Sequence, residues 1–401
     1  MPSLSQRGVD APASPIRRLA PFAQLARDRG IVVHHLNIGQ PDIETPEQML
    51  AAYRSYDERV VAYAPSDGYL DYRVRLAAYY ATVIGGSAEP ITADDIVVTV
   101  GGSEAILFAV AAIADHGDDI VVCEPYYTNY KGISHLLGVG VRPVTTHAED
   151  GFRIHPEAVA AAIGPRTRAI VIPSPGNPTG LVLSRDDLAA LAAICRDRDL
   201  FFVCDEVYRE FVYDLPEGEL APSILELPDF RDHAIVVDSV SKRYSACGSR
   251  VGALVTRNAA VRAAALRFGQ ARLSPPTVDQ HAAMAALDTP AEYFRTVKSE
   301  YRQRRDVLVE SLAAIGIECR KPDGAFYLIA TLPIADADRF CEYLLQDFDL
   351  DGETVMLAPA SGFYATPGLG KDQVRIAYVL GADKLRRCVQ IIAAALEAYP
   401  G

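Results

Sequence analysis

The sequence predicts an α/β protein: a mostly parallel sheet sandwiched by helices, joined to a smaller α+β lobe. Short β-rich runs alternate with longer Ala/Leu-rich helical patterns, which is typical of a parallel sheet covered by helices. Several of these runs are continuously apolar, as expected for strands that are buried on both faces. Beyond about residue 285 the pattern changes to one long amphipathic helix followed by weaker strands, which predicts the second lobe.

Seven runs in the first part of the chain predict the strands of the sheet. They cover residues 95–102, 118–127, 141–146, 168–180, 200–208, 234–242 and 250–256. The apolar stretch Ala105–Ala114 between the first two runs is too short for a bilayer, which needs about 20 apolar residues, and predicts a core helix. Residues 183–199 have helical spacing and begin with Ser184 and Asp187, a pair that can cap a helix N-terminus.

The second part of the chain predicts the smaller lobe. Residues 291–316 form one long amphipathic pattern, weaker strands follow at 325–330 and 374–380, and a helical pattern ends the chain. We therefore expect a large domain over residues 46–290. The small domain would consist of residues 1–45 and 291–401, with the long helix bridging the two.

Composition and charge exclude several classes of function. The 401 residues are 50% hydrophobic and 23% charged, and their net charge of -13 argues against nucleic acid or an anionic membrane as a main partner. The N-terminus lacks the apolar run of a signal peptide, and no stretch is long enough to span a membrane. The seven cysteines are scattered and show no metal-ligand spacing. These features predict a cytoplasmic protein with reduced thiols and no metal site.

Unusual polar residues follow the predicted strands, where open α/β sheets bind their ligands. At Gly101–Ser103 a predicted strand is followed by a predicted helix, so free backbone N–H groups and the Ser103 hydroxyl can bind an anion there. A plain tight turn explains these residues equally well. The proline and glycine residues of "SPGNPTG" (174–180) hold Asn177 in a rigid loop. Asp205 ends an apolar strand, where it is either a helix N-cap or the counter-ion of a buried cationic ring.

The stretch "DSVSKRYSACGSRVG" (238–252) places Lys242 among small residues just past a strand. Such a lysine is either a solvated loop residue or an amine held for chemistry. Arg250 could clamp an anion or be a surface charge, and Tyr208 could direct its hydroxyl toward the space near Asp205. An anion cradle, an amide, a carboxylate, a phenol, a lysine and an arginine are together what pyridoxal 5′-phosphate (PLP) requires.

On these residues the chain resembles the class I/II aminotransferases, the aspartate aminotransferase-like branch of the fold-type I PLP-dependent enzymes. The resemblance runs from "NIGQPD" (37–42) to "VRIAYVL" (374–380), and "SPGNPTG", "DEVY" and "SVSKRYSACGSRVG" are its most specific pieces. It implies that Lys242 forms a Schiff base with PLP and moves the Cα proton. It also implies that Asp205 meets the pyridine nitrogen, and that Tyr208 and Asn177 meet the phenolic oxygen. The implied phosphate ligands are Gly102, Ser103, Ser239, Ser241 and Arg250.

The resemblance implies further residues around the cofactor and the substrate. Tyr127 stands where the family stacks an aromatic ring, often Trp, on the cofactor; this chain contains no Trp, and Tyr supplies another π-face. Tyr63 matches a tyrosine that reaches the phosphate of the neighbouring subunit, so a homodimer with shared active sites is implied. Arg375 matches the arginine that grips the substrate α-carboxylate, with Asn177 and Gly39 beside it.

The function implied by the resemblance is transfer of an amino group from an L-amino acid to a 2-oxo acid such as 2-oxoglutarate, through pyridoxamine phosphate. An aspartate-like donor is favoured. Arg272 is the candidate second cation for its side chain, or equally a charge at a helix C-terminus; Arg17 and Arg18 are weaker candidates.

Two other functions stay open on the sequence. The same cofactor site would serve a lyase, a synthase or a cyclase, because the sequence does not fix which bond stands perpendicular to the cofactor ring. A PLP-binding regulatory protein is less favoured, since the about 36 residues before "NIGQPD" are too few and too broken by proline for a DNA-binding domain.

Overall fold

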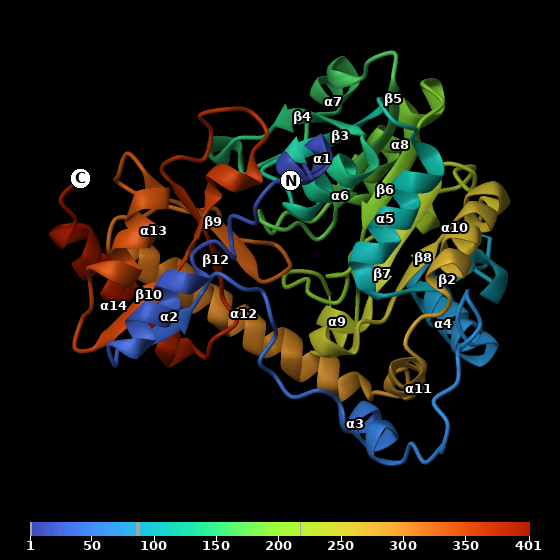
Figure 1. The fold of residues 1–401 in the computed structure, drawn as a ribbon, viewed down its shortest axis with the longest axis horizontal. Coiled ribbons are helices and arrows are strands. Elements are labelled where there is room, and N and C mark those ends of the chain that lie inside the picture. The colour runs from blue at the N-terminus through green and yellow to red at the C-terminus, as the bar shows by residue number, and fades with distance from the viewer. Residues whose placement is uncertain (1, 86–88, 217) are drawn as a thin grey trace.

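The computed structural model describes residues 2–85, 89–216 and 218–401. Its centre is a seven-stranded sheet with the strand order β2-β8-β7-β6-β5-β3-β4 (Figure 1). The strands are β2 (Ile96–Thr99), β3 (Asp119–Glu124), β4 (Gly140–Thr145), β5 (Thr167–Pro173), β6 (Phe201–Asp205), β7 (Ala234–Ser239) and β8 (Gly252–Val255). Strand β8 is antiparallel to both of its neighbours, and the other pairs are parallel. Each strand overlaps one predicted run, and the predicted α/β class is confirmed.

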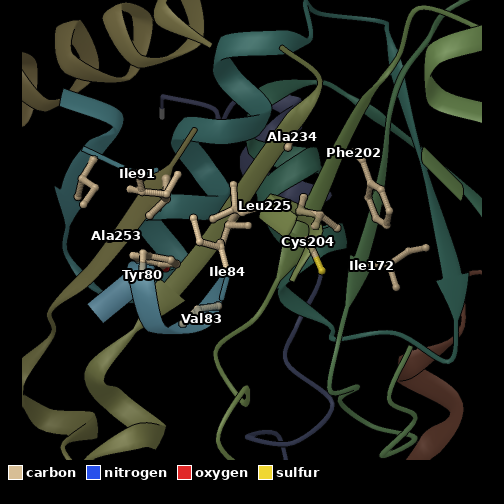
Figure 2. Close-up of a cluster of buried hydrophobic side chains, with 14 of the residues drawn as sticks. Tyr80, Val83, Ile84, Ile91, Ile172, Phe202, Cys204, Leu225, Ala234 and Ala253 are labelled. Carbon is tan, nitrogen blue, oxygen red and sulfur yellow. The ribbon is translucent and has the colours of Figure 1, made fainter. Parts of the chain in front are cut away.

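Alternate residues of the strands face two separate buried clusters, which explains their continuous apolar character. Ile170 and Ile172 belong to one cluster, whereas Ala169 and Val171 belong to the other. Figure 2 shows part of the first cluster, including Ile172. Its face of the sheet is covered by α3 (Glu47–Arg54), α4 (Leu70–Val83), α7 (Pro156–Ala162), α8 (Arg185–Asp197) and α11 (Thr277–Ala286). The other face is covered by α5 (Gly101–Ile113), α6 (Asn129–Leu137) and α10 (Ala259–Arg272).

Local sequence signals set where these helices begin. The Ser184 hydroxyl accepts a hydrogen bond from the Asp187 N–H at 3.1 Å, and the Asp187 carboxylate accepts one from the Ser184 N–H at 2.9 Å. This reciprocal pair is the predicted cap of α8, and it satisfies backbone donors that the first turn of a helix leaves free. The predicted core helix at Ala105–Ala114 lies within α5 and its one-residue extension.

The second lobe combines the C-terminal part of the chain with the N-terminal segment. Its sheets are β11-β12-β9, which is antiparallel, and the parallel pair β1-β10. The strands are β1 (Val32–His35), β9 (Tyr327–Thr331), β10 (Glu353–Met356), β11 (Ala358–Pro359) and β12 (Gln373–Ala377). Its helices are α2 (Ala20–Asp28), α12 (Ala291–Ala314), α13 (Ala337–Gln346) and α14 (Ala382–Ala398). In Figure 1 the long α12 runs from this lobe toward α11 below the large sheet.

Packing ties the N-terminal segment to the second lobe. Leu19, Ala23 and Leu36 share one buried cluster with residues of α12, α13 and α14. The domain boundaries at 45/46 and 290/291 stay a prediction, and this packing supports it. The short elements are α1 (Gln6–Val9), α9 (Val240–Arg243) and the 3-10 helices η1 (Ala93–Asp95), η2 (Ala148–Asp150), η3 (Ile224–Glu226), η4 (Cys247–Ser249) and η5 (Ala360–Phe363). Among the helices of the described residues, none has both the length and the apolar character to cross a membrane.

Candidate active site

A cavity of about 590 Å³ lies beyond the carboxyl ends of β5, β6 and β7, where the sheet meets the second lobe. The carboxyl ends of parallel strands meet at one edge of a sheet, so polar residues far apart in the chain converge there. All predicted site residues except Tyr63 and Arg272 line this cavity. They are Gly39, Gly102, Ser103, Tyr127, Asn177, Asp205, Tyr208, Ser239, Ser241, Lys242, Arg250 and Arg375.

Lys242 lies in α9, a single helical turn directly after β7. The Ser239 hydroxyl caps this turn by accepting a hydrogen bond from the Ser241 N–H at 3.1 Å. The Lys242 Nζ donates to the Gly39 carbonyl at 2.8 Å and lies 3.6 Å from the Cys247 sulfur. Within the described residues the Lys242 amine has no carboxylate at ion-pair distance. It therefore faces the cavity as an amine that is anchored by neutral atoms.

Asp205 ends β6 at the floor of the cavity and is buried. Its carboxylate accepts a hydrogen bond from the Tyr130 hydroxyl at 2.9 Å. Burial raises the pKa of Asp205 to about 6, and the Tyr130 hydrogen bond opposes that rise. A buried carboxylate with only hydrogen bonds to stabilise its charge would gain from a cation in the cavity, such as a protonated heteroaromatic nitrogen.

Two aromatic groups complete the walls beside Asp205. The hydroxyls of Tyr208 and Tyr327 lie 2.8 Å apart, and burial holds the pKa of Tyr208 well above its ordinary value, so its phenol stays a hydrogen-bond donor. The rings of Tyr127 and Tyr130 meet edge to face, with their centres 5.6 Å apart. Asn129 donates to the Tyr127 hydroxyl at 2.8 Å and so fixes that ring at the cavity wall.

The N-terminus of α5 and the loop after α9 form an anion cradle. Gly101 has a φ of +72°, and a Cβ there would overlap the guanidinium of Arg250, so glycine is required for this close approach. Arg250 donates to the Cys247 carbonyl at 3.0 Å. The hydroxyls of Ser239 and Ser241 lie 2.8 Å apart at the same wall. Helix N–H groups, hydroxyls and a guanidinium are the donors that a phosphate group prefers, so this cradle fits the phosphate of PLP.

Arg375, on β12, closes the cavity from the second lobe and is only 2% exposed. Its guanidinium donates to the Asn177 side-chain oxygen at 3.1 Å and to the Asn37 carbonyl, while its Nε has no hydrogen-bond partner among the residues that the structure describes. The ring centres of Tyr327 and Phe363 lie 4.5 and 4.9 Å from the guanidinium carbon. Burial lowers the pKa of Arg375, yet a guanidinium keeps its charge at neutral pH. A buried cation without a carboxylate partner among the described residues is suited to a ligand carboxylate.

Arg272 does not line the cavity of its own chain, and whether it meets a substrate side chain stays a prediction. It ends α10, donates to the Glu104 carboxylate at 3.3 Å and to the Val98 carbonyl at 3.1 Å, and so lies against α5. Arg18 is likewise neutralised, by Asp338 and Glu342. Arg17 differs, because it lines the cavity and forms no ion pair within the described residues.

Tyr63 lies outside the cavity of its own chain. Its side chain is 79% exposed, in the segment between α3 and α4. Val60 and Val61 in the same segment are also exposed. This geometry leaves Tyr63 free to meet another molecule, but its role in a neighbouring subunit stays a prediction.

The sequence reasoning missed three residues that shape the site. Tyr130 lies in the first turn of α6, three residues after Tyr127, and this nearness in the sequence could have indicated it. Tyr327 belongs to an ordinary apolar strand, which carries no such signal. A Cβ at Gly39 would collide with the Tyr327 hydroxyl, so the glycine is explained by this close approach. Cys247, beside Lys242, is the third missed residue.

A mostly parallel sheet with a lysine, a buried carboxylate and an anion cradle at its strand ends defines a PLP-dependent enzyme of fold type I. The chain belongs to the family "Aminotransferase class I and II", whose model matches residues 32–392. It is therefore a PLP-dependent aminotransferase, which acts on amino acids and 2-oxo acids.

Curated relatives and solved structures agree with this assignment. The chain is 33% identical to the aspartate/prephenate aminotransferase of Thermus thermophilus, with 92% of each chain covered. It is 34% identical to the arginine–pyruvate transaminase of Pseudomonas aeruginosa, with 93% of this chain and 92% of the relative covered. The solved structure of the aspartate aminotransferase from Thermus thermophilus with maleate has a TM-score of 0.88 and 30% identity, over 98% of this chain and 100% of that one.

Proposed function

We propose that Lys242, Asp205 and Arg375 carry the transamination in this chain. The observation that carries the proposal is that an amine, a buried carboxylate and a buried guanidinium without a carboxylate partner among the described residues converge on one cavity. When bound, PLP supplies an electron sink that makes the Cα proton of an amino acid acidic. Its phosphate would lie in the cradle of Gly102, Ser103, Ser239, Ser241 and Arg250.

Lys242 has two tasks in this proposal. Its Nζ would hold the aldehyde carbon of the cofactor, and the free Nζ would take the proton from the substrate Cα. The amine lies 6.0 Å from the ring centre of Tyr208 and has no carboxylate partner among the described residues, so it is available for both tasks. Its contacts to the Gly39 carbonyl and the Cys247 sulfur, both of which belong to cavity-lining residues, hold Nζ at the cavity wall.

Asp205 and Tyr208 would orient the cofactor and hold its protons. The Asp205 carboxylate would keep a proton on the ring nitrogen, because an adjacent opposite charge favours the charged form of each partner. Tyr208, which stays protonated, would donate to the phenolic oxygen, and Asn177 would supply a second donor. Tyr127 would cover one face of the ring with its own aromatic face.

Arg375 would orient the substrate by its α-carboxylate. Its contacts to Asn177 and Asn37 and the flanking rings of Tyr327 and Phe363 hold the guanidinium plane, so a carboxylate can bind with two parallel hydrogen bonds. Fixing this end of the substrate places the Cα proton near the Lys242 amine, and such placement supplies much of the rate of an enzyme reaction.

We propose further that the donor is an acidic, aspartate-like amino acid whose side-chain carboxylate meets Arg17. The cavity lining contains Lys242, Arg17, Arg250 and Arg375 but, among the described residues, Asp205 as its one carboxylate. After the phosphate and the α-carboxylate are matched, Arg17 is the cation that remains. The maleate of the solved Thermus thermophilus relative is a dicarboxylate, which supports this class of ligand.

The first experiment follows the absorption spectrum of the PLP-loaded protein as aspartate, glutamate, alanine, arginine or tyrosine is added without a 2-oxo acid. We expect aspartate or glutamate to convert the cofactor to its amino form most rapidly. Replacing Arg17 by Gln should lower kcat/KM for aspartate by about tenfold to hundredfold, the worth of one charged hydrogen bond, and leave alanine almost unchanged. Arg17→Lys, which keeps the charge, is the matched control and should lose less. Equal losses for aspartate and alanine would contradict the donor class.

We also propose a homodimer in which Tyr63 reaches the cavity of the partner. Its exposure, together with that of Val60 and Val61, supports an interface at this segment, because adjoining exposed apolar residues often mark contact surfaces. Sedimentation should give twice the chain mass, and Tyr63→Phe should weaken PLP binding without unfolding the protein. A monomer with full activity would refute this part.

The cytoplasmic location likewise stays a proposal, which cell fractionation would test.

A further inference from the structure

A buried group of charged side chains lies behind the cavity, beneath the ends of β6 and β7. We call it the charge network and define it as Glu206, Arg209, Glu210, Asp238 and Arg243. Glu206 and Arg209 are fully buried, and Asp238 and Arg243 are at most 3% exposed. None of the five lines the described cavity. Three carboxylates and two guanidinium groups taken out of water need a strong reason to be there, because each buried charge is costly unless it is paired.

The charge network is joined to the cavity through the chain itself. Four of its members are immediate chain neighbours of proposed site residues, in the pairs Asp205–Glu206, Tyr208–Arg209, Asp238–Ser239 and Lys242–Arg243. Successive side chains leave the backbone in different directions, so one member of each pair faces the cavity and the other faces the charge network. A shift of any of these four members therefore moves the backbone that carries a cavity residue.

Arg243 is the member next to Lys242, and it is fixed on several sides. Its Nη2 donates to both oxygens of Asp238, at 2.8 and 2.9 Å, and its Nε donates to Glu210 at 2.6 Å. The ring centre of Tyr79 lies 4.2 Å from its guanidinium carbon. The helix α9 has only four residues and is too short to be stable by itself. These contacts therefore hold the turn that carries the Lys242 amine.

The same group of contacts reaches the strand end that carries Asp205. Besides Arg243, Asp238 accepts from the Tyr80 hydroxyl at 2.8 Å and lies 3.6 Å from Arg209. Arg209 in turn donates to Glu206 at 2.8 Å, and Glu206 directly follows Asp205. A continuous path of hydrogen bonds and ion pairs thus joins the backbone at Lys242 to the backbone at Asp205.

We propose that the charge network is a positioning device that sets the Lys242 amine relative to the Asp205 carboxylate, with Arg243 as its central positioning residue. It acts through the backbone and touches neither cofactor nor substrate. The proposal rests on the roles proposed above for Lys242 and Asp205. It adds a function for four buried residues and the partly buried Glu210, which those roles do not use.

The test uses Arg243→Met and Arg243→Lys, with Arg257→Met as the matched control. Arg257 is also a buried arginine, but within the described residues its guanidinium donates only to backbone carbonyls, those of Leu225 and Glu89. The first readout is made on the protein without PLP: labelling of Lys242 by acetic anhydride at one fixed pH, followed by peptide mass spectrometry. Lys131, on α6, serves as the internal reference.

We expect Arg243→Met to speed the labelling of Lys242 by about threefold or more, because α9 opens more often, while Lys131 is unchanged. In the PLP-loaded enzyme kcat should fall by about tenfold or more with little change in KM, since the amine is displaced and the substrate clamp is not. Arg243→Lys, which cannot bridge Asp238 and Glu210 at once, should resemble Arg243→Met. Arg257→Met should change neither readout.

Two outcomes would overturn the inference. One is an Arg243→Met protein with wild-type labelling of Lys242 and wild-type kcat. The other is a loss of kcat equal to that of Arg257→Met, which would indicate a general effect of removing a buried arginine. If Arg243→Met does not fold, Glu210→Gln replaces it, because that change keeps the shape and removes one ion pair. A wild-type protein that does not take up PLP at Lys242 would instead refute the proposed function, so the two failures are distinguishable.

Discussion

Replacing Asp205 by Asn should stabilise the protein in the absence of PLP. Burial raises the pKa of Asp205 from 3.8 to about 6. The pKa in the folded chain thus lies above the unfolded value, so the folded chain binds more protons between about pH 4 and pH 6. Stability consequently falls as the pH rises through that window. A difference of about two pKa units corresponds to about 3 kcal/mol at neutral pH. Asn, which cannot ionise, avoids that loss.

The assay is thermal unfolding of both proteins without PLP, across the pH range. We expect the two melting temperatures to coincide well below pH 4, where Asp205 is protonated in both the folded and the unfolded chain. Above about pH 6 the Asp205→Asn protein should melt higher. Adding PLP should reverse the order, because a cationic ring beside Asp205 favours its ionised form. A stability difference that does not change with pH, or a wild type that is more stable than the variant above pH 6 without PLP, would refute this reasoning.

Three further predictions concern single side chains. Lys242→Ala should abolish turnover while the protein keeps its melting temperature within a few degrees; measurable transamination would contradict the role of Lys242. Arg375→Ala should lower kcat/KM by about a hundredfold or more, the cost of breaking a buried charged contact, with PLP affinity nearly unchanged by titration. The buried Glu124 carboxylate accepts hydrogen bonds from the Ala365 and Thr366 N–H groups at 2.6 and 3.1 Å. Glu124→Gln should therefore lower the free energy of unfolding, measured with urea, by about 1–3 kcal/mol. An unchanged urea midpoint would show that this contact contributes nothing to stability.

The predictions that depend on local sequence agreed with the structure. Continuous apolar runs predicted the seven strands of the sheet, because strands that are buried on both faces need apolar residues throughout. Most of the runs extend several residues past the observed strand ends, but their order and parallel arrangement were enough to place Asp205, Lys242 and Asn177 at one edge of the sheet. The Ser184–Asp187 cap is likewise a local signal, since both partners lie within one helical turn.

Only the tertiary structure decided which charges are free and which are paired. Arg272 and Arg17 are both arginines near helix ends in the sequence, yet Arg272 meets Glu104 across 168 residues of chain, whereas Arg17 is left facing the cavity. The Tyr130 hydroxyl reaches Asp205 across 75 residues of chain. The charge network likewise joins the ends of β6 and β7 through side chains that do not line the cavity. A sequence pattern reports burial and local geometry. The partner of a charge depends on which distant backbone folds beside it, and that depends on the packing of the whole chain.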